Sequence, residues 1–211
     1  MRDFKNCVAV VTGAGSGIGR ALAVNLAGQG AHLALSDINE AGLVETVKII
    51  EAFDVKVRAD TLDVSKQEDV FAYAEAIQAH FGQVNLVINN AGAALNGEFR
   101  DTPIDDMKWQ MDVNFWGVVY GAKAFLPFLE RAEWGHIVNV SSIFGLFSQP
   151  TQSGYNLSKF AVRGFTESLR QELDLEQCNV DATCIHPGGI QTNIARNARM
   201  TQSVENLTGN A

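Results

Sequence analysis

The chain has 211 residues, of which 46% are hydrophobic and 19% are charged, as in a folded globular protein rather than a disordered or fibrous one. Its formal net charge of −8 argues against binding to nucleic acid or to acidic membrane surfaces, which repel an acidic protein. The apolar stretch near the N-terminus is too short for a membrane span and does not resemble a signal peptide, so we expect a cytoplasmic protein.

Short apolar runs alternate with longer amphipathic stretches along the chain. The expected elements are, in chain order, strand 8–11, helix 18–29, strand 32–36, helix 40–52, strand 55–58, helix 66–80, strand 85–88, helix 104–131, strand 136–140, helix 154–176 and strand 180–185. Because strand–helix–strand units form right-handed crossovers between parallel strands, this order predicts an α/β fold, a doubly wound parallel sheet (Rossmann fold) in a single domain.

A glycine-rich turn, TGAGSGIG at 12–19, lies directly between the first expected strand and the first expected helix. Glycine tolerates unusual backbone angles and lets the main chain approach a phosphate closely. The start of the helix adds free N–H groups and the positive end of a dipole. We expect a dinucleotide pyrophosphate here, although a tight turn without a ligand would contain the same glycines. The expected contacts are Gly13, Ser16, Gly17, Ile18 and Gly19.

Asp37 ends the second expected strand, 18 residues after Gly19. An acidic side chain at this place can accept hydrogen bonds from both hydroxyls of an adenosine ribose, and it would repel a 2′-phosphate. The two positions where a basic residue could bind that phosphate are occupied by Ser16 and Ile38, not by Lys or Arg. The sequence therefore favours NAD over NADP, unless Asp37 is simply an acidic turn residue. Asp63, after the third expected strand, is a candidate adenine contact or a plain turn or helix-cap residue.

The fourth expected strand ends in Asn89-Asn90-Ala91-Gly92. In an open parallel sheet, ligands bind outside the carboxyl ends of the strands. The small residues of this segment would leave space for a cofactor at that edge. The same four residues could also form an ordinary turn at the end of a strand.

Tyr155 and Lys159 are four residues apart in an expected helix, so both project from one face. A free tyrosine has a pKa of ~10, and a neighbouring ammonium is expected to lower it by stabilising the phenolate. This suits Tyr155 as a general acid/base. A Tyr–Lys pair on the surface of an amphipathic helix would have the same spacing.

Two further polar residues fit this chemistry. Ser142 follows the fifth expected strand, at the same sheet edge as the glycine turn, where its hydroxyl can hold a substrate oxygen while Tyr155 moves the proton. Asn114 lies in an otherwise apolar stretch, and a buried Asn needs partners. Those partners are either backbone groups or a water molecule beside Lys159.

In this order and spacing, the motifs resemble those of the short-chain dehydrogenase/reductase family. The resemblance runs from Val8 to about Thr192 and includes Pro187-Gly188. It implies an NAD-dependent alcohol dehydrogenase with a catalytic tetrad of Asn114, Ser142, Tyr155 and Lys159, in which Asn114 holds a water of a proton relay from Lys159. The cofactor contacts that it implies beyond the glycine turn are Asp37, Asp63, Val64, Asn90, Ala91, Gly92, Tyr155, Lys159, Pro187, Gly188, Ile190 and Thr192.

Members of this family usually continue past the Pro-Gly turn with a substrate lid, a further helix and a final strand, whereas this sequence ends at Ala211. We therefore expect residues 1–192 to form the dinucleotide-binding and catalytic domain without the usual C-terminal strand. The polar residues 193–211 are expected to be a flexible, partial lid. The resemblance also implies a homodimer or homotetramer formed through helices around 104–131 and 154–177, although these could pack solely on their own sheet.

The expected substrate is a hydrophobic secondary alcohol or ketone, because the residues near the expected pocket are mostly apolar: Ala93, Ala94, Leu95, Ile143, Phe144, Phe147 and Gly189. Cys7, Cys178 and Cys184 are expected to be reduced, and no Cys or His spacing fits a metal site. Two other functions remain open. One is a non-catalytic dinucleotide sensor on the same fold, and the other is a serine hydrolase using Ser142, which lacks the usual GxSxG motif.

Overall fold

The computed structural model of this chain describes residues 3–190, 194 and 198–201. Its centre is a six-stranded sheet in which every pair of neighbouring strands is parallel. In spatial order the strands are β3 (Val57–Thr61), β2 (His32–Asp37), β1 (Val8–Thr12), β4 (Leu86–Asn89), β6 (Gly135–Val140) and β7 (Val180–Ile185). The doubly wound α/β fold predicted from the sequence is confirmed.

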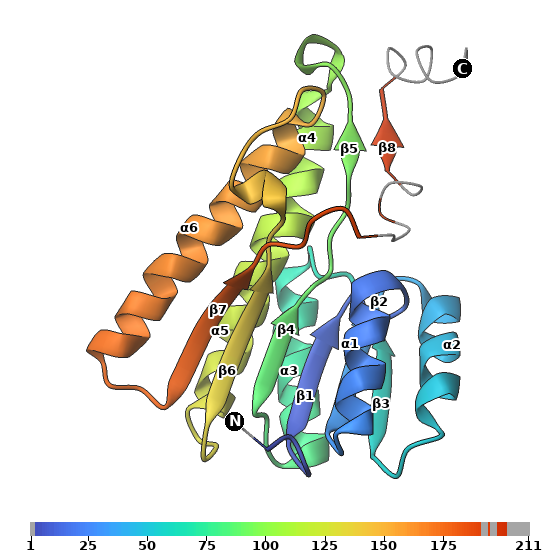
Figure 1. Cartoon of the computed structure of the whole chain (residues 1–211), viewed down its shortest axis with the longest axis vertical. Helices are drawn as coiled ribbons and strands as arrows, with labels where there is room; N and C mark the ends of the chain where they lie inside the picture. Colours follow the sequence, from blue (N-terminus) through green and yellow to red (C-terminus); the bar gives the residue numbers. More distant parts are fainter. Residues whose placement is uncertain (1–2, 191–193, 195–197, 202–211) are drawn as a thin grey trace.

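Helices cover both faces of this sheet (Figure 1). One face packs against α1 (Gly17–Gly28) and α2 (Glu40–Ile50). The other face packs against α3 (Gln67–Phe81), α5 (Gly117–Leu129) and α6 (Ser153–Leu175). None of the helices in the described part of the chain combines the length and apolar character needed to cross a bilayer.

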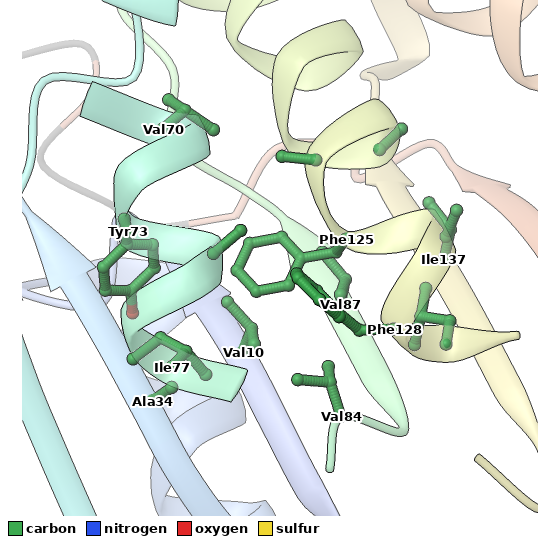
Figure 2. Close-up of a cluster of buried hydrophobic side chains, with 14 of the residues drawn as sticks. Val10, Ala34, Val70, Tyr73, Ile77, Val84, Val87, Phe125, Phe128 and Ile137 are labelled. Atoms are coloured by element: carbon green, nitrogen blue, oxygen red, sulfur yellow. The ribbon is translucent and has the colours of Figure 1, made fainter. Parts of the chain in front are cut away.

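Alternate residues along each central strand enter different cores. On β1, Val10 belongs to the cluster under α3 and α5, whereas Val11 belongs to the cluster under α1 and α2. Figure 2 shows the first cluster, in which Phe125 of α5 lies by the strand residue Val87 and Ile77 of α3 lies by the strand residue Val10. Because both faces are buried, the central strands are nearly continuous apolar runs, which is why they could be located from the sequence.

The third strand lies two to three residues later than predicted, at Val57–Thr61 instead of 55–58. It pairs with β2 from Leu33↔Val57 to Asp37↔Thr61 and forms one edge of the sheet. Its residues are half-buried or exposed, so polar side chains continue the strand where the apolar run has stopped. Hydrogen bonding to β2, and not hydrophobicity, therefore sets its end.

The long helix expected at 104–131 is divided into three parts. The α-helix α4 (Ile104–Met111) is followed by a π-helical segment, η2 (Asp112–Trp116), and then by α5. A π-helical turn contains an additional residue, and such insertions occur often at functional sites. The hydrophobic pattern does not indicate this insertion.

A second, two-stranded parallel sheet pairs β5 (Leu95–Asn96) with β8 (Arg199–Met200). Figure 1 shows these two strands side by side beyond the carboxyl edge of the main sheet. The short 3₁₀ helices η1 (Phe99–Asp101) and η3 (Ile143–Gly145) complete the described elements. The strand at Arg199–Met200 was not expected from the sequence.

Candidate active site

The topology places a binding site at the carboxyl edge of the sheet. The chain builds outward from β1 toward β3 in its first half and from β4 toward β7 in its second half. Between β1 and β4 the connections therefore leave in opposite directions, which is where doubly wound folds bind ligands. A cavity of about 460 Å³ lies there, lined by residues that follow β1, β2, β4, β6 and β7.

The glycine turn after β1 is held tightly against the end of β4. Gly13 has a φ of +66°, and a Cβ at this position would lie 2.8 Å from Ala91 Cα. The Asn90 side-chain amide donates to Thr12 O at 2.9 Å, and the backbone N–H of Ala91 donates to Thr12 Oγ1 at 3.0 Å. At Gly19, a Cβ would overlap the carbonyl oxygen of Gly13. These glycines are required by the packing of one turn against another.

The first turn of α1 is suited to an anion. Its N-cap residue, Ser16, makes no capping hydrogen bond with its side chain, and the first turn contains no acidic residue. Gly13, Ser16, Gly17 and Ile18 line the cavity at this point. Backbone N–H groups and the helix dipole are thus available to a pyrophosphate, so this part of the cavity fits a dinucleotide.

Asp37 lies at the end of β2 with both carboxylate oxygens bonded to the main chain. Its Oδ2 accepts from Gly15 N and its Oδ1 from Asn39 N, each at 2.8 Å. An ionised carboxylate has about four acceptor positions, so capacity remains for two ribose hydroxyls. The neighbouring Arg20 is paired with Glu45 at 2.9 Å and does not line the cavity.

Tyr155 lies near the start of α6 and lines the same cavity as Ser142 and Lys159. Burial raises the pKa of the Tyr155 phenol above its ordinary value of 10, and a hydrogen bond with the Ser142 hydroxyl acts in the opposite direction. The expectation that Lys159 would lower this pKa is wrong for the protein alone. The Lys159 ammonium lies 5.6 Å from the centre of the Tyr155 ring and donates to Val140 O at 3.0 Å, while desolvation of the phenol dominates.

The buried ammonium of Lys159 is accommodated beside the end of β4. Burial lowers the pKa of Lys159 to about 8. A Cβ on Gly92 would lie 3.6 Å from Lys159 Nζ and 3.3 Å from Asn114 Oδ1. The first of these distances is an ordinary contact and the second is tight, so the absence of a side chain at Gly92 gives room chiefly to the Asn114 amide.

Asn114 lies in the π-helical segment η2 and is fully buried behind the cavity wall. Its Oδ1 accepts from Ala93 N at 2.7 Å, and its Nδ2 donates to Ala93 O at 2.9 Å and to Ser158 Oγ at 3.1 Å. Ser158 Oγ in turn donates to Tyr155 O at 2.8 Å. Of the two kinds of partner considered for Asn114, the described residues provide backbone groups and a hydroxyl, which connect the end of β4 to the turn of α6 that bears Tyr155.

The structure brings most of the expected site residues to this one cavity. Those that line it are Gly13, Ser16, Gly17, Ile18, Asp37, Asp63, Val64, Asn90, Ala91, Gly92, Ser142, Tyr155, Lys159, Pro187, Gly188 and Ile190. Gly19 and Asn114 support the wall from behind. Thr192 lies outside the described residues. Of the expected substrate contacts, Ala93 and Ala94 line the cavity, whereas the other five do not: Leu95, Ile143, Phe144, Phe147 and Gly189.

Several lining residues were not expected from the sequence. They include Asn39, Trp109, Val113, Ile194 and Arg199. Asn39 could have been found from its place two residues after Asp37. The others come from α4, η2 and the segment after β7, and no local motif connects these segments to the site.

The described residues contain no cluster of three or more His, Cys, Asp and Glu side chains that could hold a metal ion. The thiols of Cys7, Cys178 and Cys184 are free. A hydrolase mechanism has no support in the serine's contacts. Ser142 Oγ accepts from Phe144 N at 3.1 Å, and His186 contacts the Ser142 carbonyl, not its hydroxyl.

Comparison with known proteins agrees with this geometry. The family model of the short-chain dehydrogenases matches residues 7–203. The chain belongs to the short-chain dehydrogenase family. SadH of Mycobacterium tuberculosis, an oxidoreductase by name, is 52% identical over 208 residues, which cover 99% of this chain and 75% of SadH.

Two solved structures to which the chain is similar contain NAD. A short-chain dehydrogenase/reductase from Burkholderia phymatum in complex with NAD has 39% identity and a TM-score of 0.90, and the match covers 93% of this chain and 70% of that one. NAD⁺-bound xylitol dehydrogenase has 31% identity and a TM-score of 0.83, with 89% and 72% covered. This short-chain dehydrogenase is therefore an oxidoreductase of CH–OH groups with a site for a nicotinamide dinucleotide.

Proposed function

We propose that this short-chain dehydrogenase transfers a hydride between NAD and a mainly hydrophobic secondary alcohol or ketone, with Tyr155 as the general acid/base. The observation that carries the proposal is that Ser142, Tyr155 and Lys159 line the same cavity as the glycine turn and Asp37. In the proposed complex, Asn114, Ser142, Tyr155 and Lys159 form the catalytic tetrad. The cofactor contacts expected from the sequence, including Thr192, bind NAD.

The bound nicotinamide would accept or supply the hydride, and the protein would supply position and proton transfer. Ser142 would hold the substrate oxygen beside the Tyr155 phenol, with which its hydroxyl is hydrogen-bonded. Because burial raises the pKa of Tyr155, the phenol is protonated at neutral pH and set to donate a proton to a ketone. The reverse reaction needs the phenolate, so it should be favoured by alkaline conditions.

Asp37 supports the choice of NAD over NADP. Its carboxylate lines the cavity, where it would repel a 2′-phosphate. Arg20, the nearby guanidinium, is already paired with Glu45. In the described part of the cavity wall, no Lys or Arg lies beside Asp37 in the sequence to bind a 2′-phosphate.

The wall at the substrate end of the cavity includes Ala94, Trp109, Val113 and Ile194, and these side chains support the proposal of an apolar substrate. We further propose a homodimer or homotetramer, because apolar side chains are exposed on η2 and α6, including Trp116 and Phe160. The cytoplasmic location stays a prediction.

The decisive variant is Tyr155→Phe, which removes the phenolic hydroxyl and keeps the ring. We expect unchanged binding of reduced cofactor, measured by its fluorescence, and a loss of about 10²-fold or more in turnover of a medium-chain ketone. Retained turnover would reject the assignment of Tyr155. Normal cofactor binding by both proteins with no turnover of any alcohol or ketone by the wild type would instead favour the sensor function.

A further inference from the structure

Arg199 is held at the cavity by the small β5–β8 sheet. The backbone N–H of Arg199 donates to Ala94 O, and that of Thr201 donates to Asn96 O, each at 3.0 Å. Thr201 is buried and would collide with any side chain at Gly97, so the second strand is packed closely against the first. Figure 1 shows this pair beyond the edge of the sheet where the cofactor turn lies. Arg199 is therefore a fixed part of the wall.

The guanidinium of Arg199 lies between an aromatic ring and a carboxylate of α4. It stacks on Trp109 at 3.5 Å from the ring centre, and its Nη1 donates to Asp106 Oδ1 at 3.0 Å. Trp109 and Arg199 both line the cavity. The side chains of Arg199 and Asp106 are 49% and 34% exposed, so Arg199 lines the cavity at its rim while its partner Asp106 lies beside it, also in contact with solvent.

The charged residues of the cavity wall show what the Arg199–Asp106 pair can influence. In the described residues, the charged side chains that line the cavity are Asp37, Asp63, Lys159 and Arg199. The two carboxylates belong to the adenosine end, and the Lys159 ammonium is bonded to Val140 O beside Tyr155. Among the described residues, Arg199 is thus the cation in the wall next to Ala94. Its guanidinium has five N–H donors, and one of them donates a hydrogen bond to Asp106.

We propose that Asp106 is a specificity-determining residue, which restricts the enzyme to substrates without a negative charge. By neutralising Arg199 at the rim, Asp106 removes the attraction that this cation would otherwise exert on a substrate carboxylate, and its own charge repels that carboxylate. Discrimination of this kind rests on an unfavourable element against the wrong substrate as well as on favourable contacts to the right one. The inference rests on the proposed function and adds the charge of the substrate to it.

The test uses three probes that differ in charge: a medium-chain methyl ketone, the same chain with a terminal carboxylate, and the methyl ester of that carboxylate. Turnover is followed by oxidation of NADH in the wild type, Asp106→Asn, Arg199→Met and the double variant. Glu167→Gln is the matched control, since it removes the carboxylate of the Arg163–Glu167 pair on α6, which does not line the cavity.

We expect the ratio of kcat/KM for the carboxylate to that for the ester to rise about fivefold in Asp106→Asn. The ratio should fall in Arg199→Met, where Asp106 is left without its cation, and should be unchanged in Glu167→Gln. An unchanged ratio in Asp106→Asn, or an equal rise in the double variant, would overturn the proposal.

A binding measurement separates this proposal from the proposed function. If the wild type turns over none of the probes, the proposed function fails, and calorimetry with the enzyme–NAD complex still tests Asp106. Tighter binding of a medium-chain fatty-acid anion by Asp106→Asn, with unchanged binding of its methyl ester, supports the role of Asp106. Equal binding of the anion by the wild type and Asp106→Asn refutes it.

Discussion

Lys159 shows how one residue's chemistry depends on burial. Its ordinary pKa of 10.5 is lowered to about 8 in the folded protein because the ammonium is desolvated. Between these two values the unfolded chain binds more protons than the folded one. The free energy of unfolding should therefore increase as the pH rises from about 8 to about 10.5.

The expected size of this effect is a few kcal/mol, measured as the difference between the wild type and Lys159→Met in urea unfolding at each pH. The difference isolates Lys159, because burial also raises the pKa of Cys7 and Tyr155, which have the opposite effect on stability in alkali. Parallel pH profiles for the two proteins would show that the ammonium is not desolvated.

Asp37 makes a second prediction at this scale. Asp37→Asn keeps an oxygen that can accept from Gly15 N but removes the negative charge at the ribose position. We expect the affinity ratio of NADH to NADPH to fall by about tenfold or more, because a charge-assisted hydrogen bond and a repulsion are lost together. Fluorescence titration with both reduced cofactors measures this ratio. Asp54→Asn, an exposed position outside the cavity, is the control for net charge, and an equal fall there would reject the role of Asp37.

Among the elements, α5 lies unusually close to β4. A Cβ at Gly121 would overlap Asn89 Oδ1, in a buried network where the Asn89 amide donates to Asn139 Oδ1 at 2.8 Å. The Asn139 amide donates in turn to Thr166 Oγ1 of α6 at 3.0 Å. The glycine thus permits a polar connection from the sheet to the helix that bears Tyr155.

Gly121→Ala should therefore destabilise the protein by about 1–3 kcal/mol in urea unfolding, although alanine favours a helix. Gly28→Ala is the matched control, since a Cβ there meets Phe53 at an ordinary 3.5 Å. It should be neutral or stabilising by up to about 1 kcal/mol. Equal effects of the two substitutions would mean that helix propensity, and not the contact with Asn89, sets the stability.

For the whole molecule, the exposed apolar surface on η2 and α6 argues for assembly. Trp116 is 43%, Leu157 52% and Phe160 40% exposed. Light scattering should give a mass two or four times the 22.9 kDa of one chain for the wild type, and that of one chain for Phe160→Glu. Ile49→Glu, at a 45% exposed position on α2, should leave the mass unchanged. A monomeric wild type would contradict the proposed oligomer.

The sequence by itself determined the alternation of strands and helices, the parallel sheet and the meeting of the glycine turn with Asp37 at one edge of that sheet. The apolar runs of β1, β2, β4, β6 and β7 follow from burial on both faces, and the glycine turn is a local motif, so both are visible in a short window of sequence. The edge strand β3 was misplaced because its last residues are polar and are held by β2.

The tertiary structure alone decided the partners of Asn114, the direction of the pKa shift of Tyr155, and the arrival of Trp109 and Arg199 at the cavity. Asn114 and Ser158 are 44 residues apart and Arg199 and Asp106 are 93 apart, so no local pattern relates them. The shift of Tyr155 depends on how completely the surrounding chain excludes water from its ring. The partners of these polar side chains and the pKa shift of Tyr155 both arise from contacts that form only when distant segments of the chain pack together.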